Sequence, residues 1–463
     1  MSFAFGFGGD DIEAEDEEEV QGQDPGHLSR EMSKYTISDP DPERPPIAVV
    51  EPKRHSLEDL LATLPSQISY NTLSISCPLS AQTPHVNPGA SPPSNYKTGL
   101  STITQNANET IHIPRRLLFD IRAQLMAETD PEHDPEGSSH GHDQFSTLLS
   151  GLENGDLTAG FYEGGFKTWE CALDLASLLV VPIQDLGICD NCDWEIVELG
   201  AGSAVPSLTL LQAFLIATTT AKWRQAGHGD GNDEHGNLNL TLCDYNEDVL
   251  RLCTAPNVLL NYLKFMKYMR GTKREHRDTE HNKHDKRAVE GKDDDDDDDD
   301  EQQEDEGEIE GELEGEGDLD FDDMPETLLE DMTEDMRARN ISIDFISGGW
   351  GEAFVQLIPQ LPPTLMATEN QKPTNLLILA SETIYSPSST GIFAETLVSL
   401  LKKHPNVQGN SARAWVAAKK VYFGVGGGVD EFVKEIERRG ARSRILMETR
   451  DTGVGRVVLD VTV

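Results

Sequence analysis

The sequence predicts an α/β protein whose mostly parallel sheet carries helices on both faces and ends in an antiparallel hairpin. Strand-like apolar segments alternate with helical segments from about residue 160 to the C-terminus. That alternation is typical of a parallel sheet, because each parallel return needs a crossover connection. The last two predicted strands are separated only by a short turn near residues 451–453, so they must pair antiparallel.

The predicted elements follow one another without an internal repeat. Short apolar runs predict the strands, and apolar residues at helical spacing predict the helices. The expected strands are Trp194–Leu199, Leu238–Cys243, Ile341–Ile346, Asn375–Ala380, Arg413–Gly424, Ser443–Glu448 and Gly455–Val463. The expected helices are Phe166–Val180, Ala204–Ala217, Glu247–Met269, Thr390–Lys403 and Val429–Arg439.

Acidic runs divide the chain into parts. The formal net charge is -45, and Asp293–Asp335 alone carries 26 acidic residues and no Lys or Arg. Such runs repel themselves and bury little apolar surface, so disorder is their expected state. We expect a mostly disordered acidic, Pro- and Ser-rich region at 1–110, a flanking segment at 111–159, and a domain at 160–463 with a disordered acidic insertion at 270–338.

Three short segments have patterns of their own. Ser56–Leu64 spaces its leucines as a helix does, and we expect it to dock on the domain. Ile113–Met126 predicts a strand or turn followed by a helix. Within the domain, the polar and Gly-rich Lys222–Asn237 predicts a loop insertion.

Composition disfavours several classes of protein. The chain begins without a positively charged region and has no apolar run of transmembrane length, so no membrane partner is expected. Its acidity disfavours DNA, and the acidic runs either are solvated spacers, which is the preferred interpretation, or attract a basic protein partner. The six scattered cysteines fit a reducing compartment, cytoplasm or nucleus. Cys189-x-x-Cys192 lacks a second ligand pair, so no metal is expected. The chain is expected to be a monomer.

The segment Val197–Leu208 has the form of a ligand-binding loop between a strand and a helix. Gly200 and Gly202, on either side of Ala201, remove Cβ atoms where a ligand approaches the backbone. The spacing is Gly-x-Gly-x-x-Pro, so the third glycine of a dinucleotide motif is missing. We therefore expect S-adenosylmethionine rather than NAD, with Glu198 suited to its cationic sulfonium.

Asp244 ends the next predicted strand, where a carboxylate can accept both ribose hydroxyl bonds. It lies 42 residues beyond Gly202 instead of about 20, and the Lys222–Asn237 insertion accounts for the excess at little cost in loop entropy. Tyr245 and Asn246 follow on the same side. The alternative is that Asp244 only caps the following helix.

Two further strand ends complete the predicted site. Gly348 and Gly349 precede Trp350, whose ring would flank an adenine unless it is only a core residue behind a turn. Ser381 and Glu382 follow an apolar strand at the edge of the sheet where ligands bind. A buried acid is unfavourable without a partner, so Glu382 is a candidate functional residue, and a simple helix start is the alternative.

A longer motif precedes these loops. Residues 160–175 read Gly-Phe-Tyr-Glu-Gly-Gly-Phe-Lys-Thr-Trp-Glu-Cys-Ala-Leu-Asp-Leu. With the four loops in this order, the segment resembles the Tyr-Glu-Gly-Gly-x-Lys-x-Trp-Glu-Cys signature of protein-histidine N-methyltransferases that modify a large-subunit ribosomal protein. The Phe-Gly-Phe start and Arg115–Asp120 look similar to that family too. The resemblance implies a Rossmann-like seven-strand methyltransferase sheet.

The resemblance also implies the contacts of the site. The residues on the S-adenosylmethionine side would be Thr168, Trp169, Glu170, Cys171, Ala172, Gly200, Asp244, Tyr245, Asn246, Gly348, Gly349, Trp350 and Ser381. We place Tyr385, Gly164 and Gly165 on the substrate side.

The expected chemistry needs no strong base. A neutral imidazole is a competent nucleophile, and its pKa of about 6.5 leaves it mostly neutral in the cell. A carboxylate that accepts the other N–H would fix the tautomer, and Glu382 and Glu170 are the candidates for that role. One alternative is a lysine-directed methyltransferase of the same fold, which must first deprotonate its target. The other is a non-catalytic acidic chaperone of a basic ribosomal protein.

Overall fold

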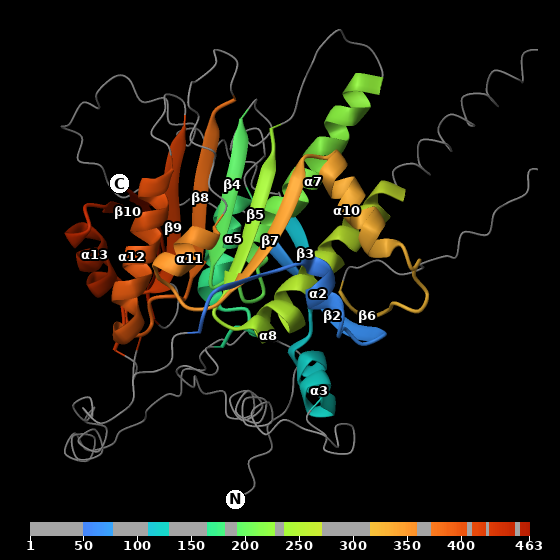
Figure 1. The fold of residues 1–463 in the computed structure, drawn as a ribbon, viewed down its shortest axis with the longest axis horizontal. Coiled ribbons are helices and arrows are strands. Elements are labelled where there is room, and N and C mark those ends of the chain that lie inside the picture. The colour runs from blue at the N-terminus through green and yellow to red at the C-terminus, as the bar shows by residue number, and fades with distance from the viewer. Residues whose placement is uncertain are drawn as a thin grey trace, which may run out of the picture.

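The computed structural model describes residues 50–76, 110–128, 164–180, 192–226, 236–270, 315–358, 372–404, 410–422, 426–449 and 454–463. Its main sheet has the strand order β1-β7-β5-β4-β8-β9-β11-β10. The bounds are β1 Lys53–His55, β4 Asp193–Leu199, β5 Leu238–Asp244, β7 Ile341–Ser347, β8 Thr374–Ser381, β9 Ser411–Lys419, β10 Arg442–Thr449 and β11 Arg456–Thr462. Figure 1 shows the strands side by side.

The pairing confirms the predicted fold class. Strands β7, β5, β4, β8 and β9 are parallel, and β11 pairs antiparallel with both β9 and β10. All seven predicted strands are present. An eighth strand, β1, extends the sheet by pairing antiparallel with β7.

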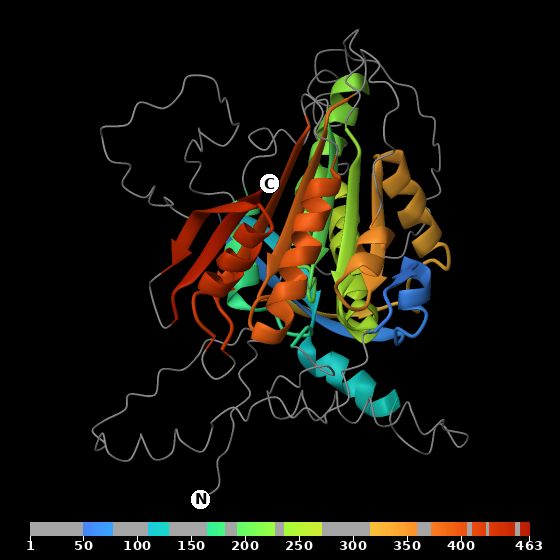
Figure 2. The ribbon, with the colours of Figure 1, turned by 60° about the vertical axis from the view of Figure 1, so that its left-hand side comes forward.

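Helices cover both faces of the sheet (Figure 2). They are α5 Glu170–Leu179, α7 Val205–Ala226, α8 Glu247–Val249 with a π-helical turn at Leu250–Thr254 (η2) and further helix at 255–270, α11 Glu352–Leu357, α12 Pro387–Lys403 and α13 Val429–Arg438. Alternate strand residues face opposite sides: Ile196 joins the core that includes α5 and α7, and Val197 joins the core that includes α11, α12 and α13.

Several element boundaries differ from those predicted. The helix expected from Phe166 begins only at Glu170, because the turn at Gly165 and Phe166 is followed by an extended backbone at Trp169, which is the N-cap of α5. The helix expected to end at Ala217 continues to Ala226, so the predicted insertion at Lys222–Asn237 starts later, and residues 227–235 lie outside the described residues. Strand β9 ends at Lys419 rather than Gly424.

A second, three-stranded sheet has the order β3-β2-β6, with β2 at Gln67–Ser76, β3 at Thr110–Arg116 and β6 at Glu316–Asp320. Helix α2, at Leu57–Leu61, buries Leu60 and Leu61 and is capped by Ser56, which confirms the predicted docking segment. Helix α3, at Leu118–Glu128, follows β3 and confirms the predicted strand and helix.

These elements correct the predicted limits of disorder. Residues 50–76 of the N-terminal region are ordered and join both sheets. The predicted disordered insertion at 270–338 contains β6 and helix α10, at Leu328–Ala338. Helix α10 is ordered because its acidic sequence also contains apolar residues at helical spacing. Met332 and Met336 lie on one face of the helix and are buried. Residues 271–314 lie outside the described residues.

Candidate active site

The glycine loop after β4 has a backbone that only small residues adopt easily. Gly200 and Gly202 have φ values of +71° and +51°. A Cβ on Gly200 would lie 2.9 Å from Thr383 Cγ2, and one on Gly202 would lie 2.8 Å from the carbonyl oxygen of Gly165. The loop is therefore packed against two other predicted site segments, and the glycines are required for that packing.

Glu198 lies beneath this loop rather than beside it. Its side chain is fully buried, and Oε2 accepts a 3.1 Å hydrogen bond from the main-chain N–H of Ser207 in α7. Burial raises the pKa of Glu198 to about 8, and the nearby Asp244 charge adds to that rise. This geometry gives Glu198 a role in holding the start of α7, and its contact with a sulfonium stays a prediction.

Asp244 links two loops at the carboxyl edge of the sheet. Its Oδ2 accepts a 3.0 Å hydrogen bond from the N–H of Gly202, and its Oδ1 accepts a 3.1 Å bond from the N–H of Asn246. A carboxylate oxygen can accept more than one bond, so both oxygens keep capacity for a ligand hydroxyl. The N-cap of α8 is Asn246 rather than Asp244, so the capping alternative does not describe the position.

The loop after β7 closes on Asp244 and Tyr245. The N–H of Gly348 donates to the carbonyls of Asp244 and Tyr245 at 3.0 and 3.2 Å. The Trp350 ring makes edge-on contacts with Phe354 and Phe393, with centroids 5.0 and 5.9 Å away. Trp350 is only partly buried, so it belongs to the core on one side and borders the loop on the other.

The segment before α5 packs onto the glycine loop. Thr168 Oγ1 donates a 2.8 Å hydrogen bond to Ser203 Oγ and accepts one of 2.9 Å from Arg115 of the second sheet. The indole N–H of Trp169 donates to the carbonyl of Gly164 at 3.0 Å. The part of the motif at residues 160–163 lies outside the described residues.

Glu382, like Ala204 of the glycine loop, has an unusual backbone conformation at this edge. Its φ is +54°, a region that residues other than glycine rarely occupy and that is concentrated at functional sites. Burial raises the pKa of its carboxyl group, and the neighbouring Cys171 thiol and Tyr422 hydroxyl oppose that rise. Glu382 Oε1 is buried and has no hydrogen-bond partner among the described residues. The same is true of Thr383 Oγ1, whose side chain packs against Gly200. Both atoms belong to the segment that directly follows β8 at the carboxyl edge of the sheet.

Glu170 is differently placed. Its carboxylate lies 3.7 Å from Lys419 Nζ and 3.9 Å from an Arg456 guanidinium nitrogen. Because those cations already neutralise it, Glu382 is the better candidate for orienting a target ring. Ala172 and Cys171 are buried in the first turn of the same helix.

Tyr422 and Thr383 are site residues that sequence reasoning missed. Tyr422 follows β9 and neighbours the Glu382 carboxyl group, and its ring lies edge-on to that of Tyr385 with centroids 6.4 Å apart. No motif marks Tyr422, because its position depends on how the loop after β9 folds back. Thr383 directly follows Ser381 and Glu382, so its place in the Ser-Glu-Thr segment is the sequence feature that could have identified it as a site residue.

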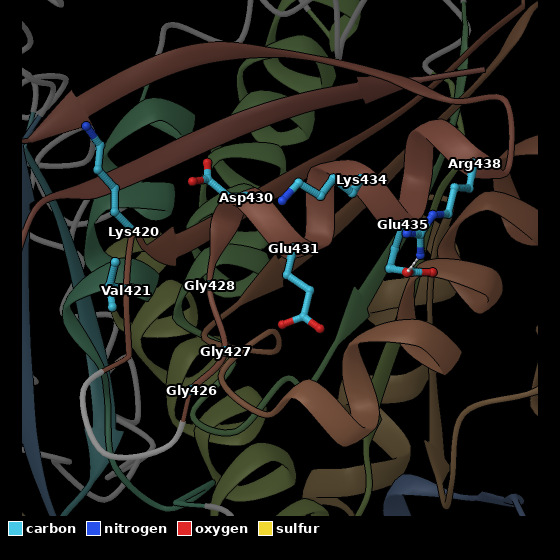
Figure 3. A pocket seen from close by; sticks show the side chains of 10 residues that line it. All are labelled: Lys420, Val421, Gly426, Gly427, Gly428, Asp430, Glu431, Lys434, Glu435 and Arg438. Carbon is cyan, nitrogen blue, oxygen red and sulfur yellow. Dashed lines mark hydrogen bonds and ion pairs between the residues drawn. The ribbon is translucent and has the colours of Figure 1, made fainter.

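A groove of about 510 Å³ opens between the loop after β9 and α13 (Figure 3). The N–H of Gly427 in this loop donates to the carbonyl of Tyr385 at 3.0 Å, so the groove adjoins the candidate site. Glu431 extends from α13 into the groove, whereas Glu435 pairs with Arg438 (Figure 3).

The chain is similar to known histidine protein methyltransferases. It is 32% identical over 318 residues to Histidine protein methyltransferase 1 of Saccharomyces cerevisiae, which covers 69% of this chain and 67% of that protein. It is 29% identical over 347 residues to the Schizosaccharomyces pombe protein of the same name, covering 74% and 75%. A Rattus norvegicus homologue is 25% identical over 308 residues, covering 66% and 59%. No model of a known protein family matches the chain.

The strand order and the loops at the carboxyl edge define a Rossmann-like methyltransferase fold. At the identity and coverage of the Saccharomyces cerevisiae relative, the chain belongs to the histidine protein methyltransferase family. The family predicted from residues 160–175 and the four loops is thereby confirmed.

Proposed function

We propose that the chain transfers a methyl group from S-adenosylmethionine to a histidine side chain of a large-subunit ribosomal protein. The observation that carries the proposal is the buried Oε1 of Glu382, which has no partner among the described residues and lies at the end of β8. A buried acceptor of this kind favours an N–H donor supplied by a ligand. An imidazole held by one nitrogen provides that donor.

The residues at the sheet edge fit S-adenosylmethionine. The glycine loop lets a ligand approach the backbone of Gly200 and Gly202. Asp244 offers acceptors for ribose hydroxyls, and Gly348–Trp350 border the expected adenine side. When bound, this molecule supplies a methyl group that is already activated on a sulfonium.

The protein's own task is then to bind and align the target ring. Glu382 would accept the N–H of one imidazole nitrogen, which leaves the other nitrogen with the lone pair that attacks. As the N–C bond forms, the bond from the methyl group to sulfur would break with a neutral thioether as leaving group; the ring would become cationic, and its remaining N–H proton would then be lost. The raised pKa of Glu382 makes it an acceptor suited to that proton. Tyr422 and Tyr385 would hold the carboxylate and the ring in place.

The proposed partner follows from charge and from the groove. The chain has a formal net charge of -45, and opposite charge steers association with a basic protein. The groove beside Tyr385 would hold the chain on either side of the target histidine, and its lining offers acidic side chains such as Glu431 and basic ones such as Lys434. Ribosomal proteins are made in the cytoplasm and assembled in the nucleus, so we propose that the enzyme acts in both compartments. We also propose that it is a monomer. Within the described residues, no helix combines the length and apolarity needed to cross a membrane.

Mass spectrometry of ribosomal proteins from cells with and without the chain tests the proposal. We expect one large-subunit histidine to lose its methyl group when the chain is absent, and to regain it with the wild-type chain but not with a Glu382→Gln variant. Loss of a methyl group from lysine instead would favour the lysine-directed alternative. Unchanged methylation, with no binding of S-adenosylmethionine to purified protein, would favour the acidic chaperone.

A further inference from the structure

Residues 50–63 lie far before the parallel strands in the sequence and yet lie on the cofactor edge of the sheet. We propose that this segment is a strap that completes the adenosine side of the cofactor site, with His55 as its positioning residue. The inference rests on the proposed function, because it assigns the strap to the S-adenosylmethionine site. It extends the site beyond the loops recognised from sequence.

The strap follows the loop after β7 along its backbone. Strand β1 pairs Lys53 with Ser347, so the residues before β1 run beside the residues after β7. The N–H of Gly349 donates to the carbonyl of Val50 at 2.9 Å. A Cβ on Gly348 would lie only 2.5 Å from Pro52 Cα. The Gly348–Gly349 loop is therefore held between β5 and the strap.

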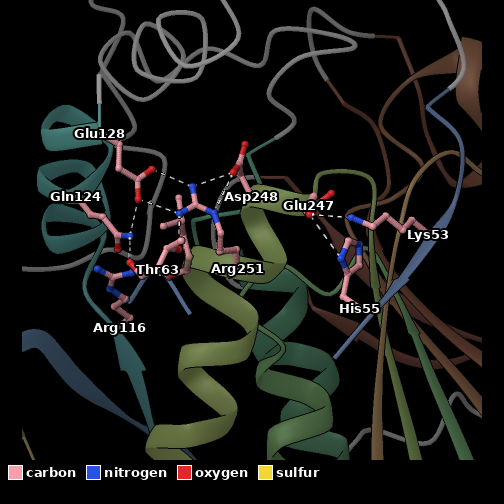
Figure 4. Close-up of polar contacts among 10 residues, drawn as sticks. Lys53, His55, Thr63, Arg116, Gln124, Glu128, Glu247, Asp248 and Arg251 are labelled. Atoms are coloured by element: carbon pink, nitrogen blue, oxygen red, sulfur yellow. Dashed lines mark hydrogen bonds and ion pairs between the residues drawn. The ribbon is translucent and has the colours of Figure 1, made fainter. Parts of the chain in front are cut away.

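His55 lies between the two loops that would flank the adenosine, and Figure 4 shows it beside Lys53 and Glu247. Its ring is buried, and Nε2 lies 2.8 Å from Ser347 Oγ, immediately before Gly348. Its Nδ1 lies 3.6 Å from Glu247 Oε1, immediately after Asn246, and Lys53 Nζ lies 3.4 Å from the same oxygen. One side chain thus bonds the end of β7 and lies beside the carboxylate at the start of α8.

The end of the strap holds the next turn of helix. Arg251 donates to both oxygens of Glu128 at 2.9 and 3.0 Å and to Thr63 Oγ1 at 2.8 Å (Figure 4). The π-helical turn at Leu250–Thr254 then brings Thr254 Oγ1 within 2.6 Å of the Gly202 carbonyl. Turns of π-helix are often found at functional sites. The strap is therefore joined to the glycine loop as well as to the adenosine loops.

This arrangement predicts an effect on affinity. Loops that are ordered only when a ligand binds reduce its affinity, because only a fraction of the free protein is competent to bind. The strap keeps both adenosine loops in place in the free protein. Loss of the His55 link should lower the competent fraction, and we expect S-adenosylmethionine to bind about tenfold more weakly.

The test compares His55→Ala with His404→Ala in the full-length chain. His404 is the control, because it is a partly buried histidine that bonds the backbone carbonyl of Thr374 at 3.0 Å on the opposite edge of the sheet. Affinity for S-adenosylmethionine is measured by calorimetry and stability by thermal unfolding. Amide hydrogen exchange is followed at residues 244–250 and 347–351.

We expect both variants to unfold at lower temperature, but only His55→Ala to lose affinity and exchange faster at the two loops. His55→Gln keeps a group able to bond Ser347 and should recover part of the affinity. If His55→Ala does not fold, Ser347→Ala removes the same hydrogen bond with a smaller change and should weaken binding in the same way.

Unchanged affinity in the folded His55 or Ser347 variant would overturn the strap, since a purely structural contact lowers stability alone. An equal loss of affinity in His404→Ala would overturn it too. If the wild-type chain itself does not bind S-adenosylmethionine, the proposed function fails, and that result is distinct from either of these.

Discussion

The N–H of Gly202 donates a 3.0 Å hydrogen bond to Asp244 Oδ2, so the loops that follow two neighbouring strands share one carboxylate. The second oxygen of Asp244 holds the N–H of Asn246. The orientation of this carboxylate is therefore fixed by backbone hydrogen bonds to both of its oxygens before a ligand binds. Because of this preorganisation, we propose Asp244 as the central contact of the cofactor side.

Asp244→Ala should weaken S-adenosylmethionine binding by about a hundredfold, because it removes charged acceptors and leaves two backbone N–H groups without partners. Calorimetry measures the affinity. Asp193→Ala is the matched control, since Asp193 bonds the N–H of Asn237 at 2.9 Å at the far edge of the sheet. The control should lose stability and keep its affinity. Equal affinities for wild type and Asp244→Ala would contradict the site.

Glu382→Gln should lower turnover by about a hundredfold, within the range for a positioned acid or base, and leave cofactor affinity within about twofold. The reason is that a glutamine side chain keeps the size of the glutamate and loses its charge. Single-turnover transfer to the protein substrate measures the effect. Glu195→Gln is the control, because Glu195 is a half-buried acid bonded to Asn239 near the other end of β4.

The same assay on Glu170→Gln separates the two carboxylates. Glu170 is already close to Lys419 and Arg456, so we expect a smaller loss of turnover than for Glu382→Gln. The reverse order of effects would move the orienting role to Glu170.

The pKa of Glu198 predicts how stability changes with pH. Burial raises the pKa from 4.5 to about 8, so the folded protein keeps a proton that the unfolded chain releases above pH 4.5. This contribution is fully present below that pH and is lost as pH rises toward about 8, at about 1.4 kcal/mol per unit. Thermal unfolding from pH 5 to 8 should show a smaller decline in Glu198→Gln than in wild type.

Glu195 provides a check on that result. Burial raises its pKa to about 7, so a weaker decline should remain in the Glu198→Gln variant. Parallel curves for the variant and the wild type would show that Glu198 is ionised in the folded protein.

Gly202→Ala should abolish tight cofactor binding and lower the unfolding temperature. The new Cβ would lie 2.8 Å from the Gly165 carbonyl, at a φ of +51° that strains any residue with a side chain. Gly391→Ala is the control, because it lies in α12 with open space around it and should stabilise that helix by about 0.5–1 kcal/mol. Calorimetry and thermal unfolding together check both variants.

Much of the fold was predictable because the strands are short apolar runs. Leu376–Leu379 and Trp194–Leu199 can be buried on both sides only in the centre of a sheet. Helix α10 was not predicted, because Met332 and Met336 stand among acids that dominate the local composition. Strand β1 was missed for a different reason: Lys53–His55 is too short and too polar to predict a strand without its partner β7.

The site was predictable where a backbone position requires glycine or a strand ends in an acid. Gly200, Gly202 and Asp244 are such positions, and the structure brings them together. Contacts between distant segments were not predictable. Tyr422 reaches Glu382, and His55 reaches Ser347, only through tertiary structure that no local spacing encodes.

Transfer of a labelled methyl group from S-adenosylmethionine to purified large-subunit ribosomal proteins tests the central claim most directly. The full-length chain is the enzyme, and peptide mass spectrometry locates the label. We expect the label on a histidine side chain, at a rate that Glu382→Gln reduces about a hundredfold. Label on lysine, or none with a chain that binds the cofactor, would contradict the account.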